Sequence, residues 1–339
     1  MLEKPDFPDE NIIACVQEAY DLAVQRLTFL PLGADVNTAV YKITTEQTAY
    51  FLKLRRGAFD EMSVALPKFL SELGISPIIP PLPTVSGRLW ADLPPFKTIL
   101  YPYIEGQNGY EITLNAQSWH EFGVALRQIH TTPIPAEFNS SLWREVYAGH
   151  GRKAVLSFLE TLIYKPFRDA VARQTAVFLQ DKKQAIIELI QRTEQLAQVL
   201  CKQSLPFVIC HSDLHAGNLL ISHEGKLYLV DWDEPILAPK ERDLMYIGGG
   251  LLASGLMAQE EEALFYAAYG QVQVNQTAVA YYRYERIIQD ILAYCEELLL
   301  TEAGGADRPQ SLRYLMSNFS PNGTIEIAYQ SARVATNGE

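Results

Sequence analysis

Three side chains between residues 208 and 233 have the types and spacing expected of a magnesium site beside a catalytic base. In the stretch VICHSDLHAGNLLISHEGKLYLVDWD, Asp213 precedes Asn218 by five residues, and Asp231 lies near the end. Magnesium takes one or two oxygen ligands from protein and completes its shell with phosphates and water. A carboxylate outside that shell can accept a hydrogen bond from a hydroxyl group and align it with a phosphate. Asn218 and Asp231 are therefore the candidate metal ligands, and Asp213 the candidate base.

A β-hairpin is predicted to bring the two candidate ligands together. The apolar runs 219–222 and 227–230 flank the four-residue turn 223–226, which contains a glycine. An antiparallel pair places the start of its first strand beside the end of its second. Asn218 precedes the first strand and Asp231 follows the second, so we expect both side chains at the open end of the hairpin.

The same segment resembles a known enzyme family. His211, Asp213 and Asn218 match the pattern H-x-D-x-x-x-x-N of protein kinases and of the aminoglycoside phosphotransferases, and Asp231 matches their magnesium-binding aspartate. Asp231 stands in DWDEP rather than DFG, which favours the small-molecule kinases. The stretches CHSDLHAGN, VDWDEPILAPKERDLMYIGGG and YYRYERIIQDI extend the resemblance through most of the chain. The sequence is therefore similar to the aminoglycoside phosphotransferase family.

This resemblance implies a fold and an activity. The expected fold is α+β and protein-kinase-like, with a small N-lobe (1–104) containing an antiparallel sheet and a larger, mainly helical C-lobe (105–339). A hinge at about 101–107 would join the lobes, and the C-lobe would hold the catalytic loop and hairpin (207–233). The implied cofactors are ATP and Mg2+, and the implied activity is ATP-dependent phosphorylation of a small-molecule hydroxyl group.

The implied acceptor is an aminocyclitol or aminoglycoside antibiotic such as spectinomycin. A metabolic kinase of the same fold, acting on choline, homoserine, methylthioribose or a sugar, shares these motifs. An inactive nucleotide-binding module is a third alternative, but the four residues that catalysis needs are present: Lys53, Asp213, Asn218 and Asp231.

The resemblance also assigns residues to the nucleotide. Lys53 ends the apolar run 50–52 and would bind the α- and β-phosphates. Asn37 and Thr38 end a loop that could donate to phosphate oxygens, although its single glycine fits a plain strand connection equally well. The backbone groups of Tyr101 and Tyr103 would bond adenine at the hinge.

Further acidic and imidazole side chains are candidates for secondary roles. Glu61 is the candidate partner of Lys53, although a surface glutamate near a helix start explains it equally well. Asp233 and Glu234 directly follow the metal aspartate and could contact an amine of the substrate. His215 lies inside the catalytic loop and could approach phosphate or substrate.

The periodicity of apolar residues places these candidates on elements. A helix is predicted over 9–20, with Asp9 as its cap, and the N-terminal third is otherwise strand-rich around the 59–73 helix. The expected strands are 25–31, 38–44, 49–54, 88–91 and 97–104. After Gly106 the chain becomes mainly helical, and the expected helices are 115–130, two or three within 152–202, then 259–270, 276–301 and 308–319.

Composition narrows the classes of partner. The 339 residues are 48% hydrophobic and 20% charged, with a formal net charge of −12. This charge argues against a nucleic-acid partner, which requires Lys and Arg to neutralise phosphates, and it suits a cationic small-molecule substrate. No apolar run is long enough to span a membrane, so a cytoplasmic protein is expected. The four cysteines lack metal-ligand spacing and are predicted to be buried free thiols.

Overall fold

The computed structural model describes residues 4–33, 37–161, 166–167, 169–301, 305–321 and 323–337. Backbone contacts divide the chain into two compact units. The first comprises Met1–Trp143, His211–Ile236 and Leu264–Gly270, and the second comprises Arg144–Cys210, Leu237–Ala263 and Gln271–Glu339. The division into an N-lobe and a C-lobe at residues 101–107 stays a prediction.

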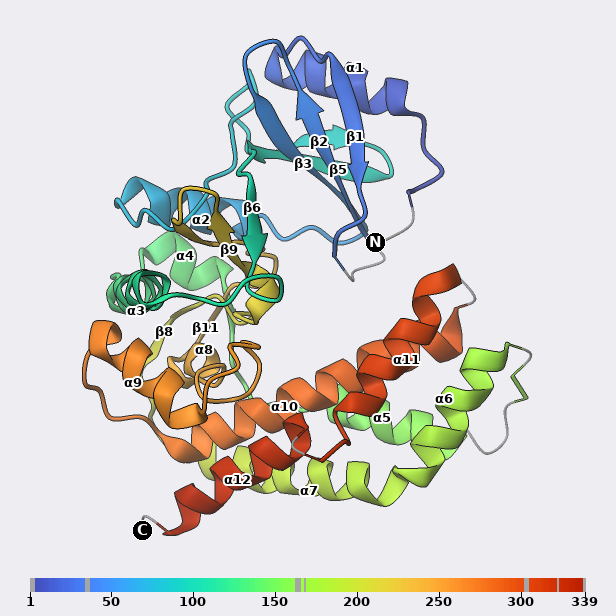
Figure 1. The fold of residues 1–339 in the computed structure, drawn as a ribbon, viewed down its shortest axis with the longest axis vertical. Coiled ribbons are helices and arrows are strands. Elements are labelled where there is room, and N and C mark those ends of the chain that lie inside the picture. The colour runs from blue at the N-terminus through green and yellow to red at the C-terminus, as the bar shows by residue number, and fades with distance from the viewer. Residues whose placement is uncertain are drawn as a thin grey trace. The chain divides into compact units, whose positions relative to one another are not determined.

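A five-stranded antiparallel sheet organises the first part of unit 1 (Figure 1), and it confirms the predicted N-terminal sheet. Its order is β1 (Arg26–Leu30), β2 (Thr38–Thr44), β3 (Ala49–Arg56), β5 (Phe96–Pro102) and β4 (Ala91–Leu93). Alternate side chains of a strand face opposite sides of a sheet. One side packs against helix α1 (Asp9–Tyr20), and the buried apolar residues of this core are Ile12, Val16, Tyr20, Ala39, Tyr41, Ile43, Leu52, Leu54, Phe96 and Leu100.

Helix α1 has the predicted bounds but not the predicted cap. Pro8 occupies the N-cap position and provides no side-chain hydrogen bond, so Asp9 is the first helical residue. The Asp9 carboxylate instead pairs with the Lys4 ammonium at 2.7 Å. A negative charge in the first turn still complements the helix dipole.

A second, three-stranded sheet contains the predicted hairpin. Strand β9 (Leu219–Ser222) pairs antiparallel with β10 (Leu227–Leu229), and β6 (Gly106–Asn108) adds to the other side of β9. Gly225 has a φ of 82°, a left-handed conformation that glycine adopts without steric cost, which explains the glycine in this turn. A Cβ at Gly106 would collide with the backbone of Ile221, so β6 can lie this close only with glycine there.

The remaining elements of unit 1 surround this small sheet. They are α2 (Met62–Glu72), α3 (Ala116–Thr131), α4 (Ala136–Ser141) and the single 3-10 turn η2 (Ala216–Asn218). Asn115 caps α3, because its side-chain oxygen accepts from the backbone N–H of Ser118 at 2.9 Å. Glu121 on α3 accepts from the backbone N–H of Leu227 at 2.9 Å and so fixes α3 to the hairpin.

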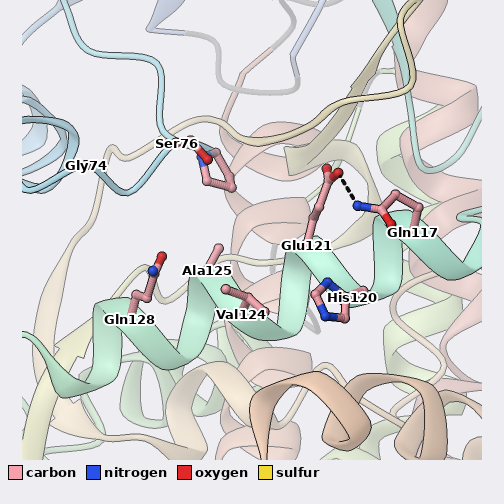
Figure 2. Close-up of a pocket in the computed structure, with 9 residues that line it drawn as sticks. Gly74, Ser76, Gln117, His120, Glu121, Val124, Ala125 and Gln128 are labelled. Carbon is pink, nitrogen blue, oxygen red and sulfur yellow. Dashed lines mark hydrogen bonds between the residues drawn. The ribbon is translucent and has the colours of Figure 1, made fainter.

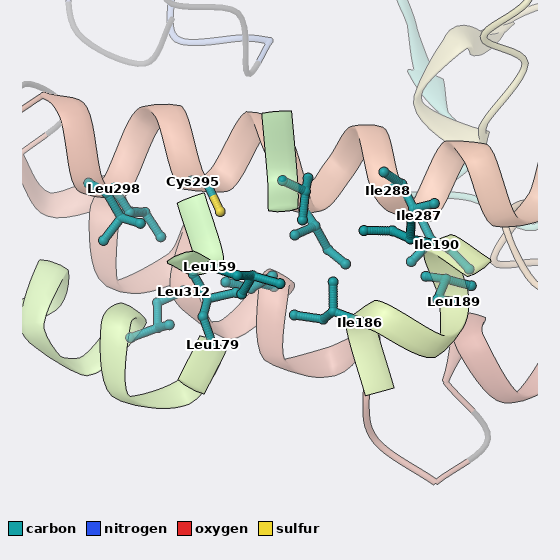
Figure 3. Close-up of a cluster of buried hydrophobic side chains, with 14 of the residues drawn as sticks. Leu159, Leu179, Ile186, Leu189, Ile190, Ile287, Ile288, Cys295, Leu298 and Leu312 are labelled. Carbon is teal, nitrogen blue, oxygen red and sulfur yellow. The ribbon is translucent and has the colours of Figure 1, made fainter. Parts of the chain in front are cut away.

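Unit 2 is mainly helical and has its own core (Figure 3). Apolar side chains of α10 (Gln276–Cys295), such as Ile287 and Ile288, meet those of neighbouring helices, including Leu159, Leu179, Ile186 and Leu189. Its other helices are α5 (His150–Thr161), α6 (Ala170–Asp181), α7 (Lys183–Leu200), α8 (Glu241–Leu244), α11 (Arg308–Ser317) and α12 (Thr324–Asn337), with the short turns η3 (Glu296–Leu300) and η4 (Gly305–Asp307). Helix α9 (Ala258–Tyr269) is divided between the units, since its residues from Leu264 onward belong to unit 1. A third sheet has the order β7 (Trp143–Arg144), β11 (Ile236–Pro239) and β8 (Phe207–Cys210). Strands β6, β7 and β11 and helix α12 were not predicted.

Two general expectations can be checked against the described residues. Within them, no helix combines the length and apolar character needed to cross a bilayer. The four cysteines are free thiols, but burial holds only for Cys210 and Cys295. Cys15 is half-buried and Cys201 is exposed, so the expectation of four buried thiols was wrong for these two.

Candidate active site

The candidate catalytic segment, residues 208–233, is held by the imidazole of His211 near its start. Nε2 of His211 lies 2.9 Å from the carbonyl oxygen of Val230, and the backbone N–H of Asp213 donates to Nδ1 at 3.3 Å. A ring with Nε2 as donor and Nδ1 as acceptor satisfies both bonds as neutral imidazole. The ring also packs against the buried indole of Trp232, at 4.5 Å between centroids. His211 therefore ties the loop carrying Asp213 to the strand leading into Asp231.

The side chain of Asn218 is oriented by hydrogen bonds to Asp213. Its Nδ2 donates to the backbone carbonyl of Asp213 at 2.8 Å and approaches the Oδ2 of that residue at 3.4 Å. Its own carbonyl accepts from the backbone N–H of Val230 at 3.0 Å, which places Asn218 opposite the residue before Asp231. Within the described part of the chain, Oδ1 of Asn218 has no hydrogen-bond partner. This oxygen is thus available as a ligand.

Asp231 lies just beyond the hairpin in an unusual backbone conformation. Its φ of 65° is in the left-handed region, which few non-glycine residues adopt. Oδ1 accepts from Nζ of Lys53 at 2.6 Å, while the side chain as a whole is 47% exposed. The protein around the carboxylate would by itself raise its pKa, but the Lys53 ammonium outweighs this and holds the pKa of Asp231 below its usual value.

Lys53 forms the centre of a four-residue charge cluster. Its side chain on β3 is buried, and Nζ donates to Asp231 at 2.6 Å and to Oδ1 of Asp233 at 2.5 Å. Arg55, two residues further along β3, pairs through Nη1 with Oδ2 of Asp233. Burial alone would lower the pKa of Lys53, but the two carboxylates reverse the effect and raise it. Burial raises the pKa of Asp233, and the two cations oppose that rise.

These oxygens suit a hard divalent cation. Asn218 offers Oδ1, and Asp231 has its second carboxylate oxygen, Oδ2, besides the one bonded to Lys53. Asp213 lies close enough to Asp231 for its charge to raise the pKa of that carboxylate. An amide oxygen and a carboxylate, next to a second carboxylate, form the kind of oxygen set that Mg2+ prefers.

His215 and Tyr110 line the approach to Asp213. Nε2 of His215 lies 3.6 Å from Oδ2 of Asp213, and its ring stacks on that of Tyr110 at 5.8 Å. Nδ1 of His215 accepts from the backbone N–H of Gly217 at 3.0 Å and caps turn η2. A Cβ at Gly217 would lie 2.7 Å from the imidazole, so only glycine leaves this ring in place.

Glu234 follows on the other side of the loop. Its side chain is exposed, while its backbone carbonyl accepts from the Ser212 hydroxyl at 2.7 Å. Ser212 itself has a φ of 74° and is, with Asp231, the second non-glycine residue in the left-handed region within the candidate catalytic segment. The bond fixes the backbone at residue 234, so its carboxylate extends from an anchored position beside the loop that carries Asp213.

The backbone groups of Tyr101 and Tyr103, the predicted adenine contacts, face the neighbouring strand β3. The backbone N–H of Tyr103 already donates to the carbonyl of Ala49 at 3.3 Å, and Tyr101 lies opposite Phe51 in the β3–β5 pair. Antiparallel pairing alternates, so both tyrosines direct their backbone groups toward β3. The other edge of β5 belongs to the intervening positions: Thr98 lies opposite Ala91 of β4, and the carbonyl of Leu100 accepts from the backbone N–H of Leu82.

The predicted pairing of Lys53 with Glu61 is also not formed. The carboxylates bonded to Lys53 are those of Asp231 and Asp233, whereas Glu61 is exposed at the N-cap of α2. The helix begins at Met62, so Glu61 lies on its entry rather than on a helical face. Glu72, at the other end, pairs with Lys68 at 3.1 Å.

The phosphate loop is described only at its ends. Gly33 has a φ of 82°, and Ala34 to Val36 lie outside the described residues. Asn37 is exposed, and its carbonyl accepts from the backbone N–H of Arg56 at 2.8 Å. Thr38 begins β2 opposite Arg55, so the loop enters the sheet beside the charge cluster on β3.

A separate hollow of about 270 Å³ lies along α3 (Figure 2). Its lining includes Ser76, Gln117, His120 and Glu121. The Glu121 carboxylate accepts from Gln117 at 2.8 Å, as Figure 2 shows, and from the backbone N–H of Leu227 in the hairpin. Oε2 thus braces the hairpin and Oε1 is held by Gln117 of the same helix, and the residues of the candidate active site are not among the lining.

Sequence reasoning missed Arg55 and Tyr110. The sequence contained a signal for Arg55. Lys53 and Arg55 are two residues apart on one strand, and the acidic residues Asp231 and Asp233 are also two residues apart. Side chains two apart on a strand share a face, so a second pair was foreseeable once the first was assigned. The sequence contained no such signal for Tyr110, because its stacking on His215 depends on the conformation of the turn between β6 and α3.

An antiparallel sheet that presents a buried lysine to an aspartate at the end of a catalytic hairpin defines a kinase-like phosphotransferase. A model described as the phosphotransferase enzyme family (APH) matches residues 28–284. The chain belongs to this family, and its fold is the α+β kinase-like fold expected from the sequence.

Solved structures give the same result. The chain is similar to spectinomycin phosphotransferase APH(9)-Ia in complex with ADP and spectinomycin, with 35% identity, a TM-score of 0.88, and coverage of 97% of this chain and 99% of that one. The AMP-bound complex of the same enzyme matches at 34% identity and a TM-score of 0.82, over 94% and 98% of the two chains. Choline kinase LicA from Streptococcus pneumoniae, at 17% identity, a TM-score of 0.56, and coverage of 91% and 97%, shares the fold alone.

Proposed function

We propose that this phosphotransferase transfers the terminal phosphate of ATP to a hydroxyl group of spectinomycin or a closely related aminocyclitol. The observation that carries the proposal is the 35% identity, over 97% of the chain, to an enzyme whose crystal structure contains ADP and spectinomycin. The intact set of Lys53, Asp213, Asn218 and Asp231 supports catalysis rather than nucleotide binding alone.

Each member of this set has a role that its contacts support. Asn218 and Asp231 would hold Mg2+, which would neutralise negative charge on the phosphates. Lys53 would exchange its bond to Asp231 for one to the α- and β-phosphates. Asp213 would accept a hydrogen bond from the acceptor hydroxyl and orient its oxygen toward the phosphorus.

The adenine contacts move by one residue relative to the sequence prediction. Alternation along β5 directs the carbonyl of Pro102 away from β3, and the next group with the same direction is the backbone N–H of Ile104. We therefore assign adenine recognition to these two backbone groups. Pro102 retains the required acceptor, because proline lacks only the donor.

The acceptor is proposed to be cationic. Glu234 is exposed on an anchored backbone beside the catalytic loop, and His215 stacks on the exposed ring of Tyr110 next to Asp213. Carboxylates there would attract an amine-bearing substrate, as the net charge of −12 also favours. A requirement for ATP is consistent with action in the cytoplasm.

The test is a panel of acceptors with Mg2+ and ATP, followed by coupled detection of ADP. Spectinomycin should give ADP release well above the acceptor-free rate, while choline, homoserine, methylthioribose and kanamycin should not. Mass spectrometry should show one added phosphate on spectinomycin. Turnover of choline or homoserine with none of spectinomycin would reject this acceptor and leave the phosphotransferase chemistry intact.

A further inference from the structure

Arg55 has a contact that the proposed catalytic roles do not use. Its guanidinium binds Oδ2 of Asp233, while Nζ of Lys53 binds Oδ1 of the same carboxylate. Asp233 is thus held between two cations that lie two residues apart on β3. Its side chain is 23% exposed and that of Arg55 is 21% exposed, so solvent screens this pair only partly.

The four side chains balance in charge. Lys53 and Arg55 contribute two positive charges, and Asp231 and Asp233 contribute two negative ones, so the cluster is formally neutral. Lys53 is shared, because its ammonium bonds both carboxylates. Arg55 is the second cation at Asp233, and Asp233 does not depend on Lys53 alone.

Nucleotide binding disturbs this balance, and on this point the inference rests on the proposed function. Lys53 then binds phosphate and Asp231 binds the metal, so the ion pair between the Lys53 ammonium and Asp233 is weakened. An unbalanced carboxylate beside a polyphosphate would repel it, and repulsion between charges a few ångströms apart is strong where water is partly excluded.

We propose that Arg55 is a positioning residue that keeps Asp233 neutralised when Lys53 engages the nucleotide. By holding Asp233, Arg55 frees Lys53 and Asp231 for phosphate and metal and removes a negative charge from the phosphate site. Arg55 acts through Asp233 and need not touch the nucleotide.

A double-mutant cycle on nucleotide binding tests this proposal without any acceptor. Affinities for ATP with Mg2+ are measured by titration calorimetry on the full chain. Arg55→Gln should weaken ATP binding by about tenfold, and Asp233→Asn alone should change it by less than about threefold. The affinity of the double variant Arg55→Gln/Asp233→Asn for ATP should return to within about threefold of the wild-type affinity, because residue 233 then carries no negative charge that a cation must neutralise.

The number of phosphates provides a second readout. The loss caused by Arg55→Gln should be largest for ATP, smaller for ADP and smallest for AMP, since repulsion grows with ligand charge. A purely structural role would lower the melting temperature and weaken all three nucleotides alike. Arg55→Lys, which keeps the charge, should bind ATP more tightly than Arg55→Gln.

The matched control is Arg56→Gln. Arg56 is the next residue of β3, is exposed, and lies against the ring of Phe96 at 5.2 Å instead of in the cluster. The substitution Arg56→Gln removes one positive charge from the same strand, as Arg55→Gln does, and should leave the affinity for ATP unchanged. Wild-type ATP affinity in Arg55→Gln would overturn the proposal. A double variant as weak as Arg55→Gln would also overturn it, because Arg55 would then act on the nucleotide directly. Loss of spectinomycin turnover with this cycle intact would count against the proposed acceptor only.

Discussion

The imidazole of His211 is bonded to the backbone of Val230, with 2.9 Å between Nε2 and the carbonyl oxygen. Its other nitrogen accepts from the backbone of Asp213. His211→Ala removes both bonds and leaves the partly buried carbonyl of Val230 without its side-chain partner, and two such bonds together typically contribute about 1–3 kcal/mol. We expect the free energy of unfolding to fall by this amount, as measured by urea denaturation, and kcat to fall as well because Asp213 loses its anchor.

The control for this change lies in the same hairpin. His223 is exposed in the turn between β9 and β10, so His223→Ala removes an imidazole without removing a side-chain bond that fixes Asp213. It should leave both stability and kcat near wild type. Equal losses in the two variants would show that His211 has no special role.

Asp213 and Asp231 should give different kinetic signatures when each is changed to asparagine. Asp213→Asn keeps the shape of the side chain but removes the base, so kcat should fall by about 10²–10⁴-fold with ATP affinity nearly unchanged. Asp231→Asn removes a metal ligand and should raise the Mg2+ concentration needed for half-maximal activity. Steady-state kinetics at varied Mg2+ separates the two, and identical signatures would contradict the assigned roles.

The Lys53 cluster predicts a loss of stability at alkaline pH. The pKa of Lys53 is raised in the folded protein, so as pH rises the unfolded chain releases its proton first and the folded state is disfavoured. The contribution of this charge is therefore complete below the unfolded pKa, at about 10.4, and declines above it.

Comparison of the wild type with Lys53→Met isolates this effect. The difference in free energy of unfolding between the two proteins should be constant from about pH 8 to about pH 9.5 and should narrow above about pH 10.4. Chemical denaturation at each pH provides the measurement. A difference that stays constant across this range would show that the ammonium gains nothing from the two aspartates.

Gly217 should tolerate no side chain. A Cβ there would lie 2.7 Å from His215 and 3.1 Å from Tyr110, so Gly217→Ala must displace the ring pair beside Asp213. We expect kcat with spectinomycin to fall by about tenfold or more, since small displacements of catalytic groups are costly. Gly151→Ala on helix α5 is the control, because its Cβ would meet only a methyl group at 3.8 Å. A fully active Gly217→Ala would contradict the proposed position of the acceptor.

The hairpin was predictable because its information is local. Two apolar runs around a glycine turn predict the antiparallel pairing, and the structure forms it, with Leu219 opposite Leu229 and Ile221 opposite Leu227. The lysine partner was not predictable in this way. Asp233 meets Lys53 across 180 residues, and no local pattern distinguishes it from Glu61.

Strand β6 and helix α12 were missed for different reasons. Gly106–Asn108 has no apolar alternation and becomes a strand only because β9 supplies its hydrogen-bond partners. The backbone directions of Tyr101 and Tyr103 could not be predicted, because they depend on a single-residue register that the strand pattern does not specify. Helix α12 carried a signal, because Ile325, Ala328 and Tyr329, which pack on the core of unit 2, are spaced as on one helix face.

The close packing of β6 on β9 limits how this chain can be re-engineered. Only three residues separate Pro102 from Gly106, whose missing side chain admits the neighbouring strand. Lengthening residues 103–105 would slide Gly106 out of its place opposite Ser222 and push a bulkier neighbour into the gap. Fusion tags, circular permutation and loop grafting should therefore avoid this short bridge, where a one-residue insertion is more damaging than most point substitutions.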